Sequence, residues 1–411
     1  MLRVFDLHAH PGLKVYYLPW LTATLHALTG SGRKWNPVAF QTRYGYLQKS
    51  PVKVLVNAHY VIEPDLVLKG FRWFSKLLFW GTAPGFLRRV VSADPWETLL
   101  DQIDHMERSV RNTNRSLLTK KKVRILRSPQ EIESLSPDEI GFIHAVEGAH
   151  ALGFPEQGQS REDFWEQTRE RLELLRERGV AMIGLAHFFD NPYCPQTEAT
   201  EIVPKVRQGK VVAARDDTLV RMRRARWRFG DPDHLAEELV RELLRLGILI
   251  DVSHVQEQSR TRIYDLCAEQ KRPVVASHVG LRHFFNHEYN LSDREILRFR
   301  ELGGVIGLIL SKRWLVDPVD RYYQGDDGIP CLIENMRHIR EVTGDVEAIA
   351  LGTDFDGLTH PFSDCYEPSQ LDRIAHAMRP YFSEDEIDRV LFGNSLRVFR
   401  RGWTGTHARA E

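Results

Sequence analysis

Short β-rich runs alternate with helical segments along the whole chain, and this alternation is the feature that most constrains the fold. Strands that are separated by helices pair in parallel, and eight such units close a (β/α)8 barrel. The predicted strands lie at residues 4–7, 52–58, 141–146, 181–186, 248–252, 273–278, 304–310 and 348–353. We therefore predict an α/β protein with a (β/α)8 TIM barrel that carries long loop insertions.

One domain accounts for most of the chain, because barrels of this kind reach 411 residues when their loops are extended. We expect this domain to span residues 1–400, with a tail at 401–411. Its predicted insertions are aromatic-rich or basic and lie at about 13–50, 64–95 and 197–231. Pro11-Gly12 is expected to stop the first strand as a turn. A pair of helices over 383–399, joined at Gly393-Asn394, is expected to pack outside the barrel.

Composition excludes several classes of protein. Lys and Arg together number 56, as do Asp and Glu, so no excess of positive charge indicates a nucleic-acid partner. The sequence starts with no apolar leader, and its most apolar run, residues 71–80, is shorter than the roughly 20 residues of a membrane span. We expect that run to be a buried helix within an insertion. The four cysteines lack Cys-x-x-Cys spacing, which indicates neither a disulfide framework nor a thiolate metal site and predicts a reducing, cytoplasmic location.

Polar side chains that are suited to metal binding follow six of the predicted strands directly. In a (β/α)8 barrel the carboxyl ends of all strands meet at one mouth, which is where catalytic residues lie. Residues alternate sides along a strand, so the two histidines of the first strand point the same way. The seven side chains expected to converge are His8, His10, Glu147, His187, His254, His278 and Asp354.

Imidazole and carboxylate without thiolate suit zinc or a similar divalent metal. We predict two such ions, with His8 and His10 on one, His254 and His278 on the other, and Glu147 as the bridge. A water between two such ions ionises near neutral pH and becomes a nucleophilic hydroxide.

Two further strand-tip residues have predicted roles in the reaction itself. Asp354 fits the group that takes the proton of the attacking water and returns it to a leaving amine. His187 either stabilises the oxyanion of the tetrahedral intermediate or orients a neighbouring ligand.

With these polar residues at the ends of its predicted strands, the chain resembles the renal (membrane) dipeptidase family of zinc peptidases. These are barrel enzymes of the amidohydrolase superfamily. The resemblance runs from residue 4 to about 400, and the matching phrases keep the family's order. They are VEGAH at 146–150, LAH at 185–187, IDVSH at 250–254, ASH at 276–278, GTDFDG at 352–357 and GNSLRVF at 393–399.

The resemblance implies a barrel of the metal-dependent hydrolase type and a metallo-dipeptidase with two zinc ions. It implies Glu147 as the bridging ligand, Asp354 as the proton shuttle and His187 as the contact to the scissile group. It also implies dipeptide substrates, often with a D-residue at the C-terminal side, and frequently a homodimer.

The chain departs from the family pattern at two places that bear on the site. The first strand carries His8-Ala9-His10 where the family usually has His-x-Asp. The family arginine that holds the substrate carboxylate aligns with Tyr289, and Arg282 lies nearby as a substitute. We count His187, Arg282 and Tyr289 as candidate substrate-binding residues.

Three functions stay open at this point. The first is a binuclear zinc hydrolase that cleaves the amide bond of dipeptides. The second is an amidohydrolase that acts on another small amide, an ester, a lactone or a phosphoester, which the His-x-His pair and the missing arginine favour. The third is a zinc-binding homologue without turnover that binds a partner through Trp73 and Trp80.

Overall fold

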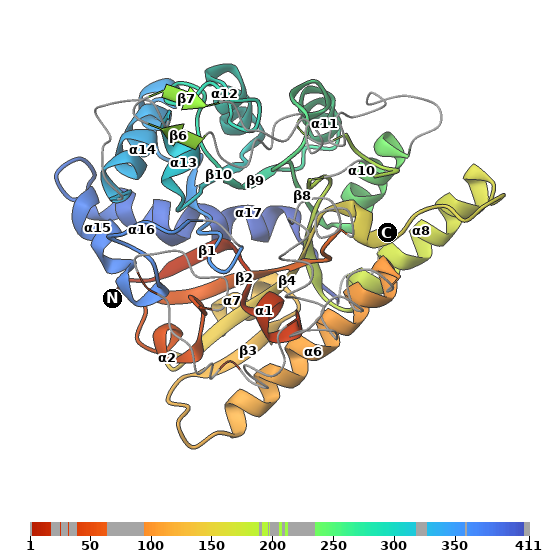
Figure 1. Ribbon diagram of the computed structural model, residues 1–411, viewed down its shortest axis with the longest axis horizontal. Helices are drawn as coiled ribbons and strands as arrows, with labels where there is room; N and C mark the ends of the chain where they lie inside the picture. Colours follow the sequence, from red (N-terminus) through yellow and green to blue (C-terminus); the bar gives the residue numbers. More distant parts are fainter. Residues whose placement is uncertain are drawn as a thin grey trace.

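A parallel β-barrel forms the centre of the computed structural model (Figure 1). The structure describes residues 2–17, 25, 32, 39–63, 94–188, 191–195, 197, 205–207, 210–212, 235–317, 327–357 and 360–406. The insertion at 64–95 lies almost entirely outside these residues, as do the expected helix at 71–80 and both tryptophans of the partner-binding hypothesis. Most of the basic insertion also lies outside them.

Eight parallel strands close the barrel, as the sequence predicts. Each strand pairs with the next around the ring, and β11 pairs with β1 to complete it. In order around the ring the strands are β1 (Val4–Ala9), β2 (Val52–Tyr60), β4 (Glu139–Glu147), β5 (Val180–Gly184), β8 (Leu249–Asp251), β9 (Val275–Val279), β10 (Val305–Leu308) and β11 (Ile349–Leu351).

Three short strands of the described residues lie outside this ring. Strand β3 (Lys122–Leu126) runs parallel to the first half of β4, from Lys122 opposite Glu139 to Leu126 opposite Ile143, and shares that edge of β4 with β5. Strands β6 (Lys205–Arg207) and β7 (Lys210–Val212) form an antiparallel hairpin within the basic insertion.

Helices surround the ring, and in Figure 1 the long helix α6 runs beside β2 and β3. Several helices begin at a capping residue. Asp94 caps α6 by accepting from Glu97 N, and Ser292 and Ser383 form capping boxes at the starts of two later helices. The α-helices are α1 (Pro11–Tyr17), α2 (Tyr44–Leu47), α6 (Pro95–Arg115), α7 (Pro129–Glu133), α8 (Arg161–Glu177), α10 (Ala236–Leu246), α11 (Glu257–Glu269), α12 (Asp293–Leu302), α13 (Lys312–Leu315), α14 (Ile329–Thr343), α15 (Asp372–Met378), α16 (Glu384–Asp388) and α17 (Asn394–Gly402). Short 3-10 turns are η1 (Ala149–Leu152) and η3 (Pro368–Gln370), and η4 (Arg389–Gly393) is a π-helical turn.

Two local expectations are wrong. Pro11-Gly12 begins helix α1 instead of forming a turn, because proline has the φ of a first helical residue and needs no amide partner there. The expected helix pair at the C-terminus is a continuous run, since η4 joins α16 to α17 without a turn.

The C-terminal run packs directly against the barrel. Phe392, Phe399 and Trp403 are buried in the same apolar cluster as Phe5 of β1, so α17 covers one end of the barrel. Two backbone hydrogen bonds, from Thr404 N to Gly247 O and from Thr406 N to Arg127 O, hold part of segment 401–411 against the barrel. The sequence predicts this segment to be a tail.

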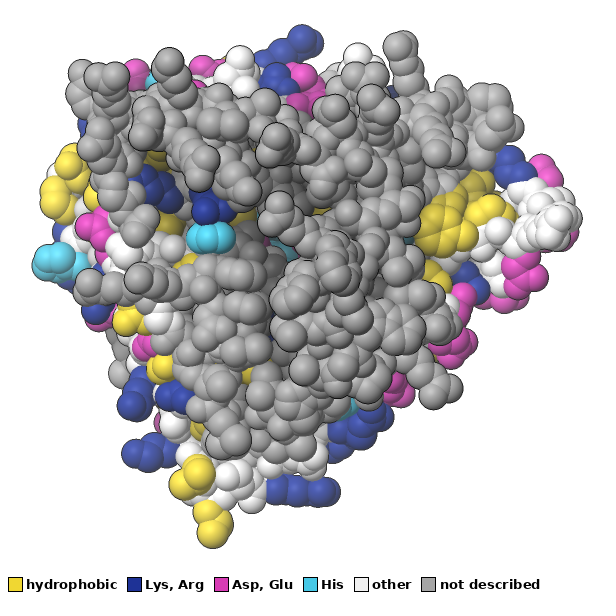
Figure 2. Space-filling view, viewed as in Figure 1, with side chains coloured by type: hydrophobic (Ala, Val, Ile, Leu, Met, Phe, Trp, Pro, Cys, Tyr) yellow, Lys and Arg dark blue, Asp and Glu magenta, His cyan; other side chains and the backbone are white. Residues whose placement is uncertain are grey.

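Charged side chains of both signs lie on the outer helices. Figure 2 shows them interspersed at the edge of the visible face where α8 lies. On α8, Arg169 pairs with Glu166 and Arg176 with Glu173. Such exposed pairs each contribute about 0–1 kcal/mol, so they tell little about stability. The four cysteines are buried and form no disulfide. None of the helices in the described ranges has the length and apolar character needed to cross a membrane.

Candidate active site

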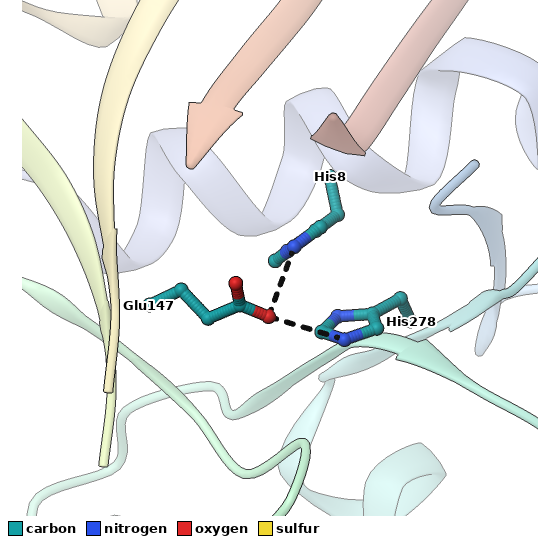
Figure 3. A group of neighbouring side chains, drawn as sticks. All are labelled: His8, Glu147 and His278. Carbon is teal, nitrogen blue, oxygen red and sulfur yellow. Dashed lines mark ion pairs between the residues drawn. The ribbon is translucent and has the colours of Figure 1, made fainter. Parts of the chain in front are cut away.

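All seven side chains predicted from the strand tips lie together at one end of the barrel. They are buried, each with 6% or less of its surface exposed, although imidazoles and carboxylates are normally at the surface. Strand β1 carries His8, and His10 follows its last residue. Strand β4 ends at Glu147, and His278 lies in β9. The segments that follow β5, β8 and β11 supply His187, His254 and Asp354. Figure 3 shows His8 and His278 turned toward the same carboxylate oxygen of Glu147.

Glu147 is the centre of the group. Its Oε1 lies 3.3 Å from His8 Nε2, 3.4 Å from His278 Nε2, 3.6 Å from His254 Nε2 and 3.8 Å from His187 Nε2. Its Oε2 lies 3.5 Å from His10 Nε2. One carboxylate therefore reaches both predicted histidine pairs, as a bridging ligand must.

The spacing of the donor atoms fits the predicted metal ions. His8 Nε2 lies 3.0 Å from His10 Nε2, and His254 Nε2 lies 3.0 Å from His278 Nε2. Two donors at 2.0–2.1 Å from one tetrahedral zinc ion lie about 3.3 Å apart, which is close to these values. Asp354 Oδ1 is 3.3 Å from His10 Nε2, on the side of the first pair.

The orientation of His10 also fits a metal ligand. Its Nδ1 lies 3.0 Å from the carbonyl oxygen of Ala58, which can only accept a hydrogen bond. Nδ1 therefore carries the proton, and in the neutral ring Nε2 presents a lone pair toward Glu147 and His8. Such an arrangement of acceptors is stable when a cation lies between them.

The electrostatics of the group favour bound positive charge. Burial works against ionisation of Glu147, but the imidazoles of His187, His8 and His10 hold its pKa well below the usual range. Burial likewise opposes the charged form of His8, yet Glu147 raises the pKa of that ring to about 9. The two shifts have one origin, because an anionic carboxylate in a poorly solvated site attracts a proton or a metal ion strongly.

Strained backbone occurs at the same place. Among the described residues, four that are not glycine have positive φ, and three of them follow β8 and β11: His254 at 65°, Asp354 at 55° and Asp356 at 68°. Such conformations cluster at functional sites, where the surrounding structure holds them. A Cβ on Gly357 would lie 1.7 Å from Asp354 Oδ1, so only glycine leaves room for this carboxylate.

A buried carboxylate that the sequence reasoning missed supports His187. Glu63 Oε1 accepts from His187 Nδ1 at 3.1 Å and from Phe188 N at 3.3 Å, and its other oxygen accepts from the Tyr60 hydroxyl. Burial opposes ionisation, but His150 and His187 lower the pKa of Glu63 to about 2. Glu63 lies three residues beyond the last residue of β2, so extending the strand-tip rule to that strand would have found it.

The two other candidate substrate contacts already have partners within the protein. Both Nη atoms of Arg282 donate to the Glu257 carboxylate, at 3.1 and 2.9 Å. Tyr289 is buried against His254, with ring centroids 4.9 Å apart, and its hydroxyl donates to the carbonyl oxygen of His278. Tyr289 thus borders two of the predicted metal-ligand histidines, whereas both Nη atoms of Arg282 are paired with Glu257.

Comparison with known protein families gives a match to membrane dipeptidase (peptidase family M19) over residues 233–408. The family resemblance is confirmed. The matched region of the membrane dipeptidase family carries His254, His278 and Asp354, while His8, His10, Glu147 and His187 precede it.

Individual relatives are similar over part of their own length. An uncharacterised protein of Klebsiella pneumoniae is 26% identical over 167 residues, which cover 40% of this chain and 59% of that protein. An uncharacterised dipeptidase of Schizosaccharomyces pombe is 28% identical over 244 residues, which cover 57% of this chain and 50% of the relative. The chain thus spans between half and three fifths of the length of these two relatives.

A solved structure is similar over nearly the whole chain. It is a metallopeptidase from Rhodobacter sphaeroides liganded with a phosphinate mimic of the dipeptide L-Ala-D-Ala. The TM-score is 0.68 at 19% identity, and the match covers 98% of this chain and 99% of the other. The likeness confirms the barrel fold.

Proposed function

We propose that this protein is a binuclear zinc hydrolase that cleaves the amide bond of dipeptides. The observation that carries the proposal is the convergence of five imidazoles and two carboxylates on one buried point at the barrel mouth. The match to membrane dipeptidases supports the reaction class. The dipeptide mimic in the Rhodobacter metallopeptidase supports an L,D-dipeptide as the substrate class.

His8 and His10 would hold one zinc ion, His254 and His278 the other, and Glu147 would bridge them. The two ions would supply an ionised water at neutral pH and would polarise the scissile carbonyl.

The protein's own groups then position and move protons. Asp354 accepts the proton of the attacking water and delivers it to the leaving amine nitrogen. His187 donates a hydrogen bond from Nε2 to the carbonyl oxygen as negative charge develops there. Burial opposes protonation of His187, but Glu63 and Glu147 raise its pKa, which favours the donor form.

A second function is supported by the pairing of Arg282. Because its guanidinium is held by Glu257, it does not provide a free cation for the carboxylate of a dipeptide. This favours a substrate without that carboxylate, such as another small amide, an ester or a lactone. The same metal centre serves all these reactions, since each passes through a tetrahedral intermediate.

The test combines metal content with a substrate panel. Protein purified without chelator is expected to contain two zinc equivalents by elemental analysis and to hydrolyse L,L- and L,D-dipeptides. If the protein contains two zinc equivalents but hydrolyses only esters, lactones or blocked amides, its substrate belongs to the second class and is not a dipeptide. Absence of bound metal would overturn the proposed function as a whole.

A further inference from the structure

One hydroxyl group contacts histidines of both predicted metal pairs. Ser277 Oγ lies 2.9 Å from His8 Nδ1 and 2.8 Å from His278 Nδ1. It also donates to Asp251 Oδ2 at 2.5 Å and lies 3.4 Å from the hydroxyl of Ser253. Ser277 and Asp251 are 0% and 3% exposed, so the protein itself must provide their hydrogen bonds.

The chemistry of these groups fixes the direction of each hydrogen bond. An ionised carboxylate only accepts, so the Ser277 proton goes to Asp251. The two lone pairs of the hydroxyl oxygen then accept from His8 Nδ1 and His278 Nδ1. Both rings therefore carry a proton on Nδ1, and in their neutral, metal-binding form Nε2 is unprotonated on the side of Glu147.

The position of Ser277 is held on several sides. Asp251 Oδ1 accepts from Ser277 N at 2.9 Å and from Ser253 N at 3.0 Å, which ties β9 to the end of β8. A Cβ on Gly352 would lie 1.6 Å from the Ser277 carbonyl oxygen, and one on Gly307 would lie 2.1 Å from it. These close approaches leave the serine little freedom to move away from the two imidazoles.

We propose that Asp251 and Ser277 form a positioning pair that sets the tautomer of one histidine ligand on each of the two metal ions. The inference rests on the proposed function, because His8 and His278 must be ligands of different ions. A single hydroxyl thus controls whether Nε2 is free to bind metal in one histidine of each predicted pair. Outer-shell partners of this kind affect metal affinity about 10- to 100-fold.

Asp251→Asn tests the direction of the hydrogen bonds with little change in shape. The remaining carbonyl oxygen must still accept from Ser253 N and Ser277 N, so the amide nitrogen faces Ser277 Oγ and donates to it. The serine proton must then go to one imidazole, which forces that ring to carry its own proton on Nε2. We expect one of the two zinc ions to bind about 10- to 100-fold more weakly, while the other is retained.

Ser277→Ala and Ser277→Thr complete the test. Alanine removes the acceptor from both rings, so both zinc affinities should fall, whereas threonine keeps the hydroxyl and should restore them. Ser395→Ala is the matched control, because Ser395 is also fully buried and its hydroxyl has no partner in the described part of the chain. This control should bind zinc as the wild-type protein does.

The measurement is zinc titration against a competing chelator, with thermal unfolding as the check on folding. Three results together would support the positioning pair. Asp251→Asn should weaken the binding of one zinc ion, Ser277→Ala should weaken the binding of both, and Ser395→Ala should leave zinc binding unchanged. If both variants bind two zinc ions as tightly as the wild-type protein, this inference is wrong and the proposed function stands. If the wild-type protein itself binds none, the proposed function has failed first.

Discussion

Single residues at the strand tips determine what this barrel can do. Glu147 faces ring nitrogens of five histidines, and in four of these rings the other nitrogen contacts a further group of the protein. His10 donates to a backbone carbonyl, His187 to Glu63, and His8 to Ser277. These supporting contacts explain how so many polar side chains stay ordered in a buried site.

Asp354→Asn should separate binding from chemistry. Asparagine tolerates the left-handed backbone at this position and keeps one oxygen for the contact with His10, but it cannot take a proton. We expect kcat to fall about 10²- to 10⁴-fold at unchanged zinc content, measured by steady-state kinetics and elemental analysis. Full activity in this variant would exclude Asp354 as the proton carrier.

Glu63→Gln should weaken catalysis through His187. The amide can preserve the hydrogen bonds to His187 and Phe188 but removes the negative charge that favours a protonated imidazole. We expect kcat to fall about 10- to 100-fold with a smaller change in KM. Tyr60→Phe is the control, since it removes a hydroxyl contact to Glu63 and leaves the carboxylate in place. A change in KM alone would assign Glu63 to substrate binding instead.

Whole elements are held to the barrel by a few buried or half-buried polar groups. On α6, Glu107 meets Arg127 at 2.8 Å, Arg178 at 3.6 Å and His144 of β4 at 3.7 Å. It therefore joins a helix, a barrel strand and two loops. His144, together with Arg127 and Arg178, lowers the pKa of Glu107 to about 2 despite partial burial.

The contribution of Glu107 to stability should depend on pH. A carboxyl group with a depressed pKa stabilises the folded state above its ordinary value near 4.5 and loses this effect as the pH falls toward 2. Glu107→Gln should therefore lower the free energy of unfolding by about 1–2 kcal/mol at neutral pH, and the difference should shrink below pH 4.5. Denaturant unfolding across this range is the measurement.

Asp101→Asn on the same helix provides the control for this effect. Its carboxylate forms a half-exposed pair with Arg108 at 3.5 Å, which should contribute little. An equal loss of stability in both variants, or a loss that does not vary with pH, would contradict the role assigned to Glu107.

The sequence predicts the barrel and the seven central side chains because both depend on local patterns. A polar residue directly after a strand must lie at the mouth once strands and helices alternate, so His254 and Asp354 could be placed without a structure. The supporting residues depend on which strands become neighbours. The contact of Ser277 with His8 joins β9 to β1, and that of Glu63 with His187 joins the end of β2 to the end of β5. The spacing of residues along the sequence does not predict these contacts between different strands.

At the scale of the whole molecule, the two ends of the barrel have separate tasks. The mouth carries the polar group, and the opposite end is covered by α17 and filled by aromatic rings. Phe399 lies 4.9 Å from Phe5 between ring centroids, and Trp403 packs beside it. Apolar packing at the base thus holds the first strand and the last helix together, while the mouth bears the chemistry.

Phe399→Ala should reduce stability and leave the site intact. Removal of a fully buried ring costs about 3–5 kcal/mol, which thermal or denaturant unfolding will show. Zinc content and kcat per folded molecule should not change below the unfolding transition, because the base is remote from the mouth. Leu396→Ala, at the edge of the same cluster, should cost less. Loss of zinc from folded Phe399→Ala would show that base and mouth are coupled.

The pairing of β1 with β11 also sets the order of events during synthesis. His8 leaves the ribosome first among the predicted ligands, but its strand is flanked on one side by β11, and Asp354 N bonds to the His8 carbonyl oxygen at 2.8 Å. Until that last strand emerges, the ring is open and the ligands cannot converge. Under the proposed function, we therefore expect metal capture to be a late step of maturation, so that the ion acquired would be the one available where the finished chain folds.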